Sequence, residues 1–243
     1  GVLRLSDPDG PPPAPGQFSM LTAAERWGGG GDERPFLPRA FSVMRVHDGE
    51  AHYLLEDVGP GTNRLCELRE GDACWVLGPL GQGFAEPRDG RRACLAGGGV
   101  GIAPLAIWQD ALLERDAPHA LLLGFRDGAH AEGANLLRCA RTATDDGSLG
   151  HHGYVTELLV AELDEHPHAE VYACGPPLML EAVRAICEER AIPSQLALES
   201  GMACGFGACF GCVVATADGG YLRVCVDGPV VAGEQLAEVV GHP

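Results

Sequence analysis

Four of the ten cysteines stand close together near the C-terminus, and their spacing constrains the fold of that region. Cys204, Cys209, Cys212 and Cys225 form the pattern C-x4-C-x2-C-x12-C. This three-plus-one grouping is typical of a plant-type [2Fe-2S] cluster. Structural zinc sites usually pair two C-x2-C units, so zinc is the weaker alternative. A disulfide framework suits smaller secreted domains that lack a core of their own.

The residues around these cysteines also favour a metal-binding loop. Gly205, Gly207 and Gly211 allow the chain to wrap tightly and to turn its N–H groups towards sulfur. Two short apolar runs, 213–216 and 221–224, flank Asp218-Gly219, which predicts a β-hairpin that returns Cys225 to the other three cysteines. A redox cysteine pair of thioredoxin type would need a helix in place of this hairpin.

The first 88 residues predict a small β-barrel. Short apolar runs at 17–21, 40–46, 52–58 and 73–77 alternate with Gly and Pro. We expect one short helix after Thr62, which can cap it, with Gly71 at its end. Because the chain begins at Gly1 without an initiator Met, we expect an N-terminal piece to be missing.

From about residue 91 strands and helices alternate, which is typical of a parallel α/β domain. We predict buried strands at 93–96, 120–125 and 170–173. Helices are predicted from Pro104 to about Arg115 and from Pro176-Pro177 to about Arg190. Their apolar faces are assigned to Leu105, Trp108 and Leu112, and to Leu178, Val183 and Ile186. The fold class is therefore multi-domain α/β plus β, with units at 1–88, 89–192 and 193–243.

The charge of the chain limits its partners. The formal net charge is −17, and all 17 basic residues are Arg. Such an acidic surface argues against nucleic acid or an anionic membrane as the partner. No apolar stretch approaches about 18 residues, so no transmembrane helix is predicted.

Two turns of the α/β region are candidate nucleotide sites. Gly97 to Gly101 lies between a strand and a helix, where it can cradle a phosphate, although a tight packing turn is the alternative. Cys174-Gly175-Pro176 lies at the same kind of strand end, where a buried cysteine beside a helix-starting proline is equally plausible. Arg126 suits a 2′-phosphate and Asp127 a free ribose hydroxyl, so the residues leave NADP and NAD open.

The β region holds weaker candidates. In Arg39-Ala40-Phe41-Ser42, the guanidinium can pair with a pyrophosphate and Phe41 can cover an aromatic ring. A surface arginine beside core residues is the plainer interpretation. Gly59-Pro60-Gly61-Thr62 is either a second phosphate site or a capped turn. The pair His151-His152 is interpreted as loop residues and not as metal ligands.

Taken together, these motifs resemble a known family. The chain is similar to the electron-transfer subunits of two-component bacterial dihydroorotate dehydrogenases, within the ferredoxin reductase superfamily. The cysteine-bearing segment is the most specific part. Three features depart from the family pattern: the first strand of its flavin barrel is expected to be missing before Gly1, and Phe41 and Pro60 replace other residue types. The matching segments are 15–18, 39–42, 61–62, 78–84, 97–104, 174–176, 202–212 and 225–229.

The resemblance implies an electron relay of NAD(H), FAD and a [2Fe-2S] cluster. Its partner would be an FMN-containing catalytic subunit that oxidises dihydroorotate to orotate in cytoplasmic pyrimidine biosynthesis, in a heterotetramer of two of each. No acid–base residue is expected for the hydride step. The residues implied for FAD are Arg39, Ala40, Phe41, Ser42, Leu54, Leu55, Glu56, Gly61 and Thr62. Those implied for NAD are Gly97, Gly98, Gly99, Gly101, Cys174, Gly175 and Pro176, and the cluster ligands are Cys204, Cys209, Cys212 and Cys225.

Three other functions stay open at this point. A related subunit of a sulfhydrogenase or of a ferredoxin:NADP oxidoreductase would share every cofactor, and its co-purifying protein would identify it. A self-standing NAD(P)H reductase would be a monomer with full turnover. A zinc-stabilised nucleotide-binding module would be colourless and free of iron.

Overall fold

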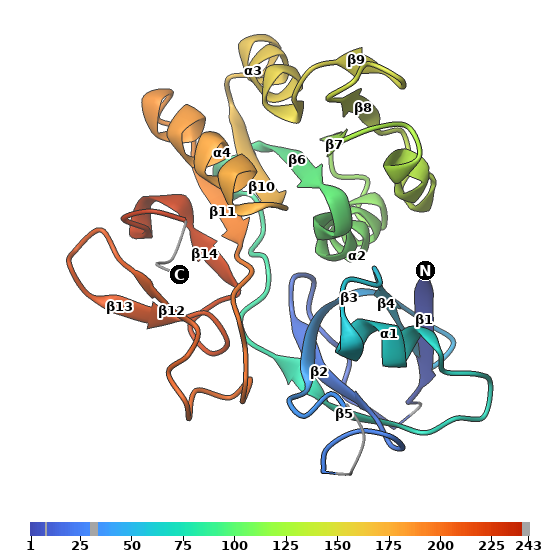
Figure 1. Ribbon diagram of the computed structural model, residues 1–243. Helices are drawn as coiled ribbons and strands as arrows, with labels where there is room; N and C mark the ends of the chain where they lie inside the picture. Colours follow the sequence, from blue (N-terminus) through green and yellow to red (C-terminus); the bar gives the residue numbers. More distant parts are fainter. Residues whose placement is uncertain (8, 30–33, 240–243) are drawn as a thin grey trace.

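The computed structural model describes residues 1–7, 9–29 and 34–239. Its chain forms an antiparallel sheet, a larger mostly parallel sheet, and a C-terminal hairpin beside them (Figure 1). The expected α/β-plus-β fold class is confirmed.

The N-terminal sheet has five antiparallel strands in the order β1-β4-β3-β2-β5. It curls around a small core that contains Leu21, Val43, Tyr53 and Leu65. Its strands are β1 Val2–Ser6, β2 Phe18–Ala23, β3 Arg39–His47, β4 Glu50–Leu54 and β5 Cys74–Leu80.

The short helix of this region, α1 Pro60–Cys66, begins and ends earlier than the sequence predicts. Proline fits the first helical turn because its missing N–H would have no partner there. Thr62 therefore lies inside that turn, where its hydroxyl accepts hydrogen bonds from the N–H groups of Val58 and Gly59. Gly71 lies beyond the end of the helix and does not cap it.

The second sheet has seven strands in the order β14-β11-β10-β6-β7-β8-β9, parallel except for β14. From β6 the chain runs outward to β9, and it then returns to place β10 on the other side of β6. Between β6 and β10 the strand order therefore reverses. The strands are β6 Arg92–Gly98, β7 His119–Phe125, β8 Arg141–Thr144, β9 His151–His152, β10 Ala169–Cys174, β11 Ser194–Ala197 and β14 Val230–Ala232.

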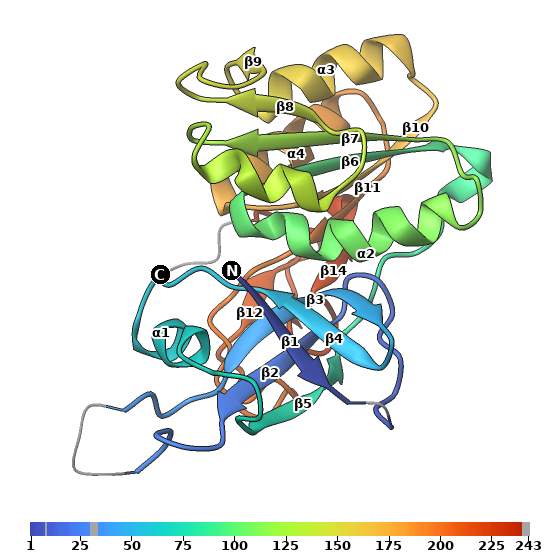
Figure 2. The same ribbon diagram turned by 90° about the vertical axis from the view of Figure 1, so that its right-hand side faces the viewer.

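Helices cover both faces of this sheet. The helix α2 Ile102–Leu113 lies between the sheet and β3 of the first sheet, whereas α3 Val155–Glu165 and α4 Pro177–Glu189 cover the far face (Figure 2). Leu105, Trp108 and Leu112 are buried on α2, as predicted. The apolar face predicted for α4 is partly wrong, because Leu178 is 80% exposed and Leu180 is buried instead. No helix in the described residues is long and apolar enough to cross a bilayer.

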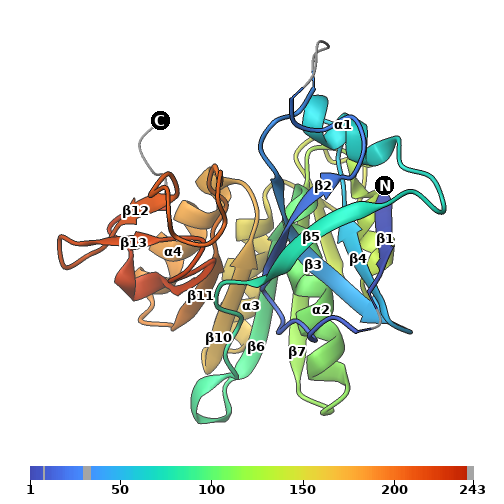
Figure 3. The same cartoon turned by 90° about the horizontal axis from the view of Figure 1, so that it is seen from below.

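The C-terminal hairpin, β12 Val213–Ala215 and β13 Tyr221–Arg223, is confirmed. It lies beside β11 and away from α1 (Figure 3). Short 3-10 turns complete the chain: η1 Arg88–Gly90, η2 Gly99–Gly101, η3 His130–Leu136 and η4 Gly233–Gln235.

Several elements were not anticipated from the sequence: β1, β8, β9, α3, β11 and β14. The apolar residues Val155, Leu158, Leu159 and Leu163 of α3 do recur at helical spacing and are all buried. The strands β11 and β14 are short and follow residue 192, yet they extend the second sheet.

A buried polar network ties the segment between the two sheets to the second sheet. Gln195 of β11 accepts a hydrogen bond from the Ala85 N–H (2.8 Å) and donates one to the Glu170 carboxylate (2.8 Å). The carboxylate of Glu170 is fully buried and also accepts the N–H of Arg88 (2.7 Å). Since buried polar groups are costly without partners, this network fixes where the chain leaves the first sheet.

We predict that Gln195→Ala lowers the free energy of unfolding by about 2 kcal/mol, because it removes the acceptor of the Ala85 N–H and one of the hydrogen bonds that the buried Glu170 carboxylate accepts. Chemical denaturation measures this change. The matched control is Gln235→Ala at an exposed position. Equal effects of the two substitutions would contradict the role of the network.

Candidate functional site

The two glycine-bearing turns predicted to bind nucleotide lie side by side. They follow β6 and β10, at the carboxyl edge where the strand order reverses, which is the usual ligand site of an open α/β sheet. A Cβ on Gly101 would lie 2.6 Å from the Cα of Gly175, and a Cβ on Gly98 would lie 2.7 Å from the Met179 sulfur. The backbones approach as closely as glycine allows.

The middle of the first turn is open. Gly99 has a φ of +56°, and a Cβ there would have no neighbour within 4 Å. Its backbone is therefore accessible just before α2 begins. This geometry suits the phosphate-cradle interpretation of Gly97 to Gly101, while the contacts of Gly101 show that the same turn also serves packing.

A cavity of about 210 Å³ opens beside these turns, where the two sheets meet the C-terminal segment. Ala40, Ser42 and Leu54 of the first sheet line one wall. Val100, Ala103 and Pro104, at the start of α2, line another. The third wall is formed by residues 198–200, Met202 and Pro229.

Not every residue implied for FAD lines this cavity. Phe41 alternates with Ala40 and Ser42 along β3 and packs against the core of the first sheet. Leu55 is buried in the same core, and Glu56 is exposed. Side-chain alternation along a strand explains why neighbouring positions of one motif separate in this way.

A second group of implied residues meets at the start of α1. The Arg39 guanidinium fills the space beside Gly61, where a Cβ would lie 2.5 Å from Nε, and it stands 5.8 Å from the Trp27 ring. The indole N–H of Trp27 is buried and has no hydrogen-bond partner. An arginine, a glycine and an unpartnered donor are the groups that a pyrophosphate would use.

Glu199, Ser200 and Met202 were missed from the sequence, because only the fold brings them to the cavity. Part of the Glu199 side chain reaches solvent, yet burial among its neighbours raises the pKa of its carboxyl. Burial of Cys174 itself, and then the nearby Glu199, raise the pKa of the Cys174 thiol well above its usual range. Burial thus shifts the pKa of both groups in the same direction.

The four clustered cysteines converge at the junction of the hairpin and the first sheet. The Cys225 N–H donates to the Cys212 sulfur at 3.4 Å, and the Gly211 N–H donates to the Cys209 sulfur at 3.4 Å. Backbone N–H groups, first that of Cys209, lower the pKa of Cys204 to about 6. Burial and then Cys212 raise the pKa of Cys225 to about 11. The loop thus supplies N–H donors to sulfur, as expected from its glycines.

The four sulfurs are spread more widely than the ligands of a single zinc ion. A tetrahedral zinc with bonds of about 2.3 Å would hold its sulfurs about 3.8 Å apart. Within the part of the chain that the structure describes, no three of these sulfurs lie within 4.8 Å of one another. A two-metal cluster requires such a wider set.

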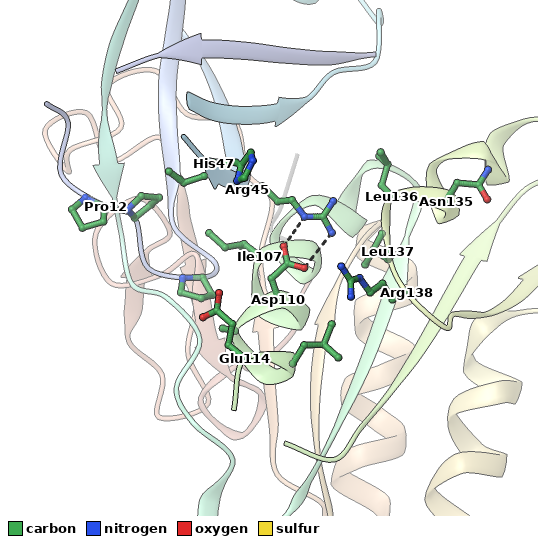
Figure 4. A pocket seen from close by; sticks show the side chains of 15 residues that line it. Pro12, Arg45, His47, Ile107, Asp110, Glu114, Asn135, Leu136, Leu137 and Arg138 are labelled. Atoms are coloured by element: carbon green, nitrogen blue, oxygen red, sulfur yellow. Dashed lines mark hydrogen bonds and ion pairs between the residues drawn. The ribbon is translucent and has the colours of Figure 1, made fainter. Parts of the chain in front are cut away.

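Two other places are less suited to a cofactor. A larger groove, about 760 Å³, lies along α2 towards the C-terminal end of that helix (Figure 4). The groove contains none of the implied residues, and Arg45 in its lining is already paired with Asp110 at 2.5 Å. Glu162, Glu165 and His166 could in principle share a cation, but Glu162 is already paired with two arginines.

His151 and His152 form the short edge strand β9, not a loop. His151 pairs with Glu157 at 2.8 Å. No other described carboxylate or cysteine forms a metal-ligating group with them.

Comparison with known proteins adds independent information. Residues 199–237 match the iron-sulfur cluster binding domain of dihydroorotate dehydrogenase B, and residues 95–185 match the oxidoreductase NAD-binding domain. The chain is similar to dihydroorotate dehydrogenase B (NAD(+)) electron transfer subunits. That of Clostridium acetobutylicum is 33% identical and covers 97% of this chain and 91% of its own length. That of Clostridium perfringens is 36% identical, over 91% of this chain and 86% of its own length.

Solved structures agree with these matches. An NADH-dependent reduced ferredoxin-NADP oxidoreductase aligns with a TM-score of 0.80 at 26% identity, over 98% of this chain and 84% of its own. The ferredoxin NADP+ reductase of Neisseria gonorrhoeae shares the fold, with a TM-score of 0.61 at 20% identity over 78% and 84%.

We predict that Gly101→Ala destabilises the protein by about 1–3 kcal/mol, because its Cβ would press on the backbone of Gly175 and force the turns apart. Thermal denaturation measures the effect. Gly29→Ala, at an open loop position, is the control and should be nearly neutral. A stable Gly101→Ala protein would contradict the close packing of the turns.

The raised pKa of Glu199 predicts a pH-dependent stability. As the pH rises past 4.5, the usual pKa of the group, the carboxyl loses its proton more readily in the unfolded protein than in the native one. The stability of the wild type therefore falls with rising pH until the native pKa is passed. Glu199→Gln removes this cost. The stability of Glu199→Gln relative to the wild type should rise with pH from about 4.5 and then level off. Chemical denaturation at several pH values measures this difference. Glu70→Gln, at an exposed position, is the control and should show a smaller change of relative stability with pH. Equal changes for the two variants would contradict the effect of burial on Glu199.

Proposed function

The chain belongs to the family of dihydroorotate dehydrogenase B electron transfer subunits, and on this basis we propose that it carries electrons between NAD(H) and a catalytic subunit that converts dihydroorotate to orotate. The observation that carries this proposal is the placement of the four-cysteine loop and the glycine turns around one junction of the fold. A related reductase of another system is the less supported alternative.

The described residues fit all three redox groups. Arg39, Gly61 and Thr62 would hold the FAD pyrophosphate, with Trp27 beside them. Ala40, Ser42 and Leu54 would line its ring system. Residues 97–101 and 174–176 would bind the nicotinamide nucleotide, and Cys204, Cys209, Cys212 and Cys225 would ligate the [2Fe-2S] cluster.

Bound FAD would link hydride transfer, which moves two electrons, to single-electron transfer through the cluster. The chain's own residues position and shield these groups. The glycines of the two turns permit close approach of a ligand, and Ala103 and Pro104 give one cavity wall an apolar surface. The Glu199 carboxyl, whose pKa is raised by burial, lies at this wall.

The remaining parts of the proposal concern organisation. The partner is an FMN-containing catalytic subunit in a heterotetramer of two of each, located in the cytoplasm. The units at 1–88, 89–192 and 193–243 would hold FAD, NAD(H) and the cluster respectively. Family membership supports these assignments.

The test is an anaerobic visible spectrum of the purified protein, loaded with FAD, iron and sulfide, during titration with NADH and then NADPH. The expected result is flavin and iron–sulfur absorption that bleaches with NADH. Transfer to the catalytic subunit and dihydroorotate then follows in a coupled assay. A protein that stays colourless and contains one zinc would overturn the proposal.

We predict that Cys209→Ser lowers the iron content and the cluster absorption to a small fraction of the wild-type values, because one ligand is lost. Cys66→Ser is the matched control, since Cys66 is also exposed but lies in α1. Iron analysis and visible absorption measure both variants. Retention of the full cluster in Cys209→Ser would exclude Cys209 as a ligand.

A further inference from the structure

The corner that follows β7 carries a charged cluster that the relay itself does not require. In parallel register, β6 and β7 pair Gly97 with Leu123 and Gly98 with Gly124, so their carboxyl ends share one edge of the sheet. The turn η3 packs against the start of α2, since a Cβ on Gly133 would lie 2.9 Å from the Ile102 side chain. The adenosine ribose of a dinucleotide bound at the glycine turn lies over this second strand in such folds.

Hydrogen bonds fix the tautomer of His130 at this corner. Its Nδ1 lies 2.7 Å from Oδ1 of Asp127, and its Nε2 lies 2.6 Å from Nη2 of Arg126. A carboxylate only accepts and a guanidinium only donates, so Nδ1 carries the hydrogen and Nε2 is the acceptor. One imidazole therefore bridges the two residues that suit opposite cofactors.

The two ends of this bridge have opposite consequences. Oδ1 of Asp127 also accepts the N–H of His130 at 3.0 Å, and these bonds, first that of the side chain, lower the pKa of Asp127 to about 2. Oδ2 is 3.5 Å from Nε of Arg126, beyond a good hydrogen bond, and keeps its lone pairs for a ribose diol. Arg126, the only cation of this cluster, has its Nη2 engaged at the imidazole.

We propose that His130 is a positioning residue that makes this site selective for a dinucleotide with a free 2′-hydroxyl, by orienting Asp127 and by tying Arg126 to its ring. A 2′-phosphate would meet the Asp127 carboxylate, with Asp146 as a second negative neighbour. The nearest arginine, Arg126, would have to give up its Nη2 contact with the imidazole to bind that phosphate through both terminal nitrogens. This inference rests on the proposed function, since it presumes that the glycine turn binds a nicotinamide dinucleotide.

Two variants separate the two ends of the bridge. His130→Asn keeps a donor near the Nδ1 position and loses the acceptor for Arg126. His130→Gln places an acceptor near the Nε2 position and loses the bond to Asp127. We expect His130→Asn to raise kcat/KM for NADPH about tenfold. We expect His130→Gln to raise KM for NADH about tenfold, as for the loss of one charge-assisted hydrogen bond.

A binding measurement on the holoprotein gives a second readout without turnover. Calorimetry compares 5′-AMP with 2′,5′-ADP, which differ only in the 2′-phosphate. The wild type should favour 5′-AMP, and His130→Asn should reverse or abolish that preference. Adding Arg126→Gln to His130→Asn should remove the gain, because the gain needs the released guanidinium. His47→Asn, an exposed histidine on β3, is the matched control and should change neither ratio.

The outcomes are distinct. A wild type that uses NADH and NADPH equally, or a His130→Asn protein with an unchanged ratio, overturns this inference and leaves the proposed function intact. A protein that binds neither nucleotide and is reduced by neither overturns the proposed function and this inference with it. If the His130 variants fail to fold, Arg126→Gln alone decides: an unchanged preference for 5′-AMP supports the tied arginine, and a changed one contradicts it.

Discussion

The close packing of two glycine turns at the reversal point of the parallel sheet is the constraint on which the site depends. Gly101 and Gly175 leave no room for a Cβ between the ends of β6 and β10. This contact sets where α2 begins, and α2 in turn is the surface on which β3 of the first sheet packs. The cavity at the junction follows from this arrangement in part, because the start of α2 forms one wall and β3, which packs on α2, contributes to another.

The first sheet is held to the second in two different ways. At one end of the junction, the buried network of Gln195 and Glu170 holds the connecting chain. Along α2, Arg45 of β3 forms a partly exposed ion pair with Asp110 (Figure 4). Buried hydrogen bonds that would otherwise go unsatisfied constrain a junction more than a solvent-screened pair does. We therefore attribute the placement of the first sheet against the second mainly to the network.

The cysteine loop links the third part of the chain to the same junction. A Cβ on Gly205 would lie 2.5 Å from the Met20 side chain, so the loop packs directly on β2. The strand β14 follows Cys225 closely and pairs with β11 of the large sheet. A cluster held by this loop is thus anchored on both sheets, which gives an electron path a rigid frame without a separate domain interface.

The sequence by itself determined the chemistry and the class of fold. The cysteine spacing, the glycine turns and the D-G hairpin are local signals, since each depends on residues that are near one another in the chain and on backbone conformations that few residues permit. The tertiary structure decided what no local signal carries. It separated Phe41 from Ser42 on opposite faces of β3, brought Glu199 to the cavity, joined β11 and β14 to a distant sheet, and bridged Asp127 to Arg126 through His130. These results depend on packing between segments far apart in sequence, or on side-chain directions that only the folded backbone fixes.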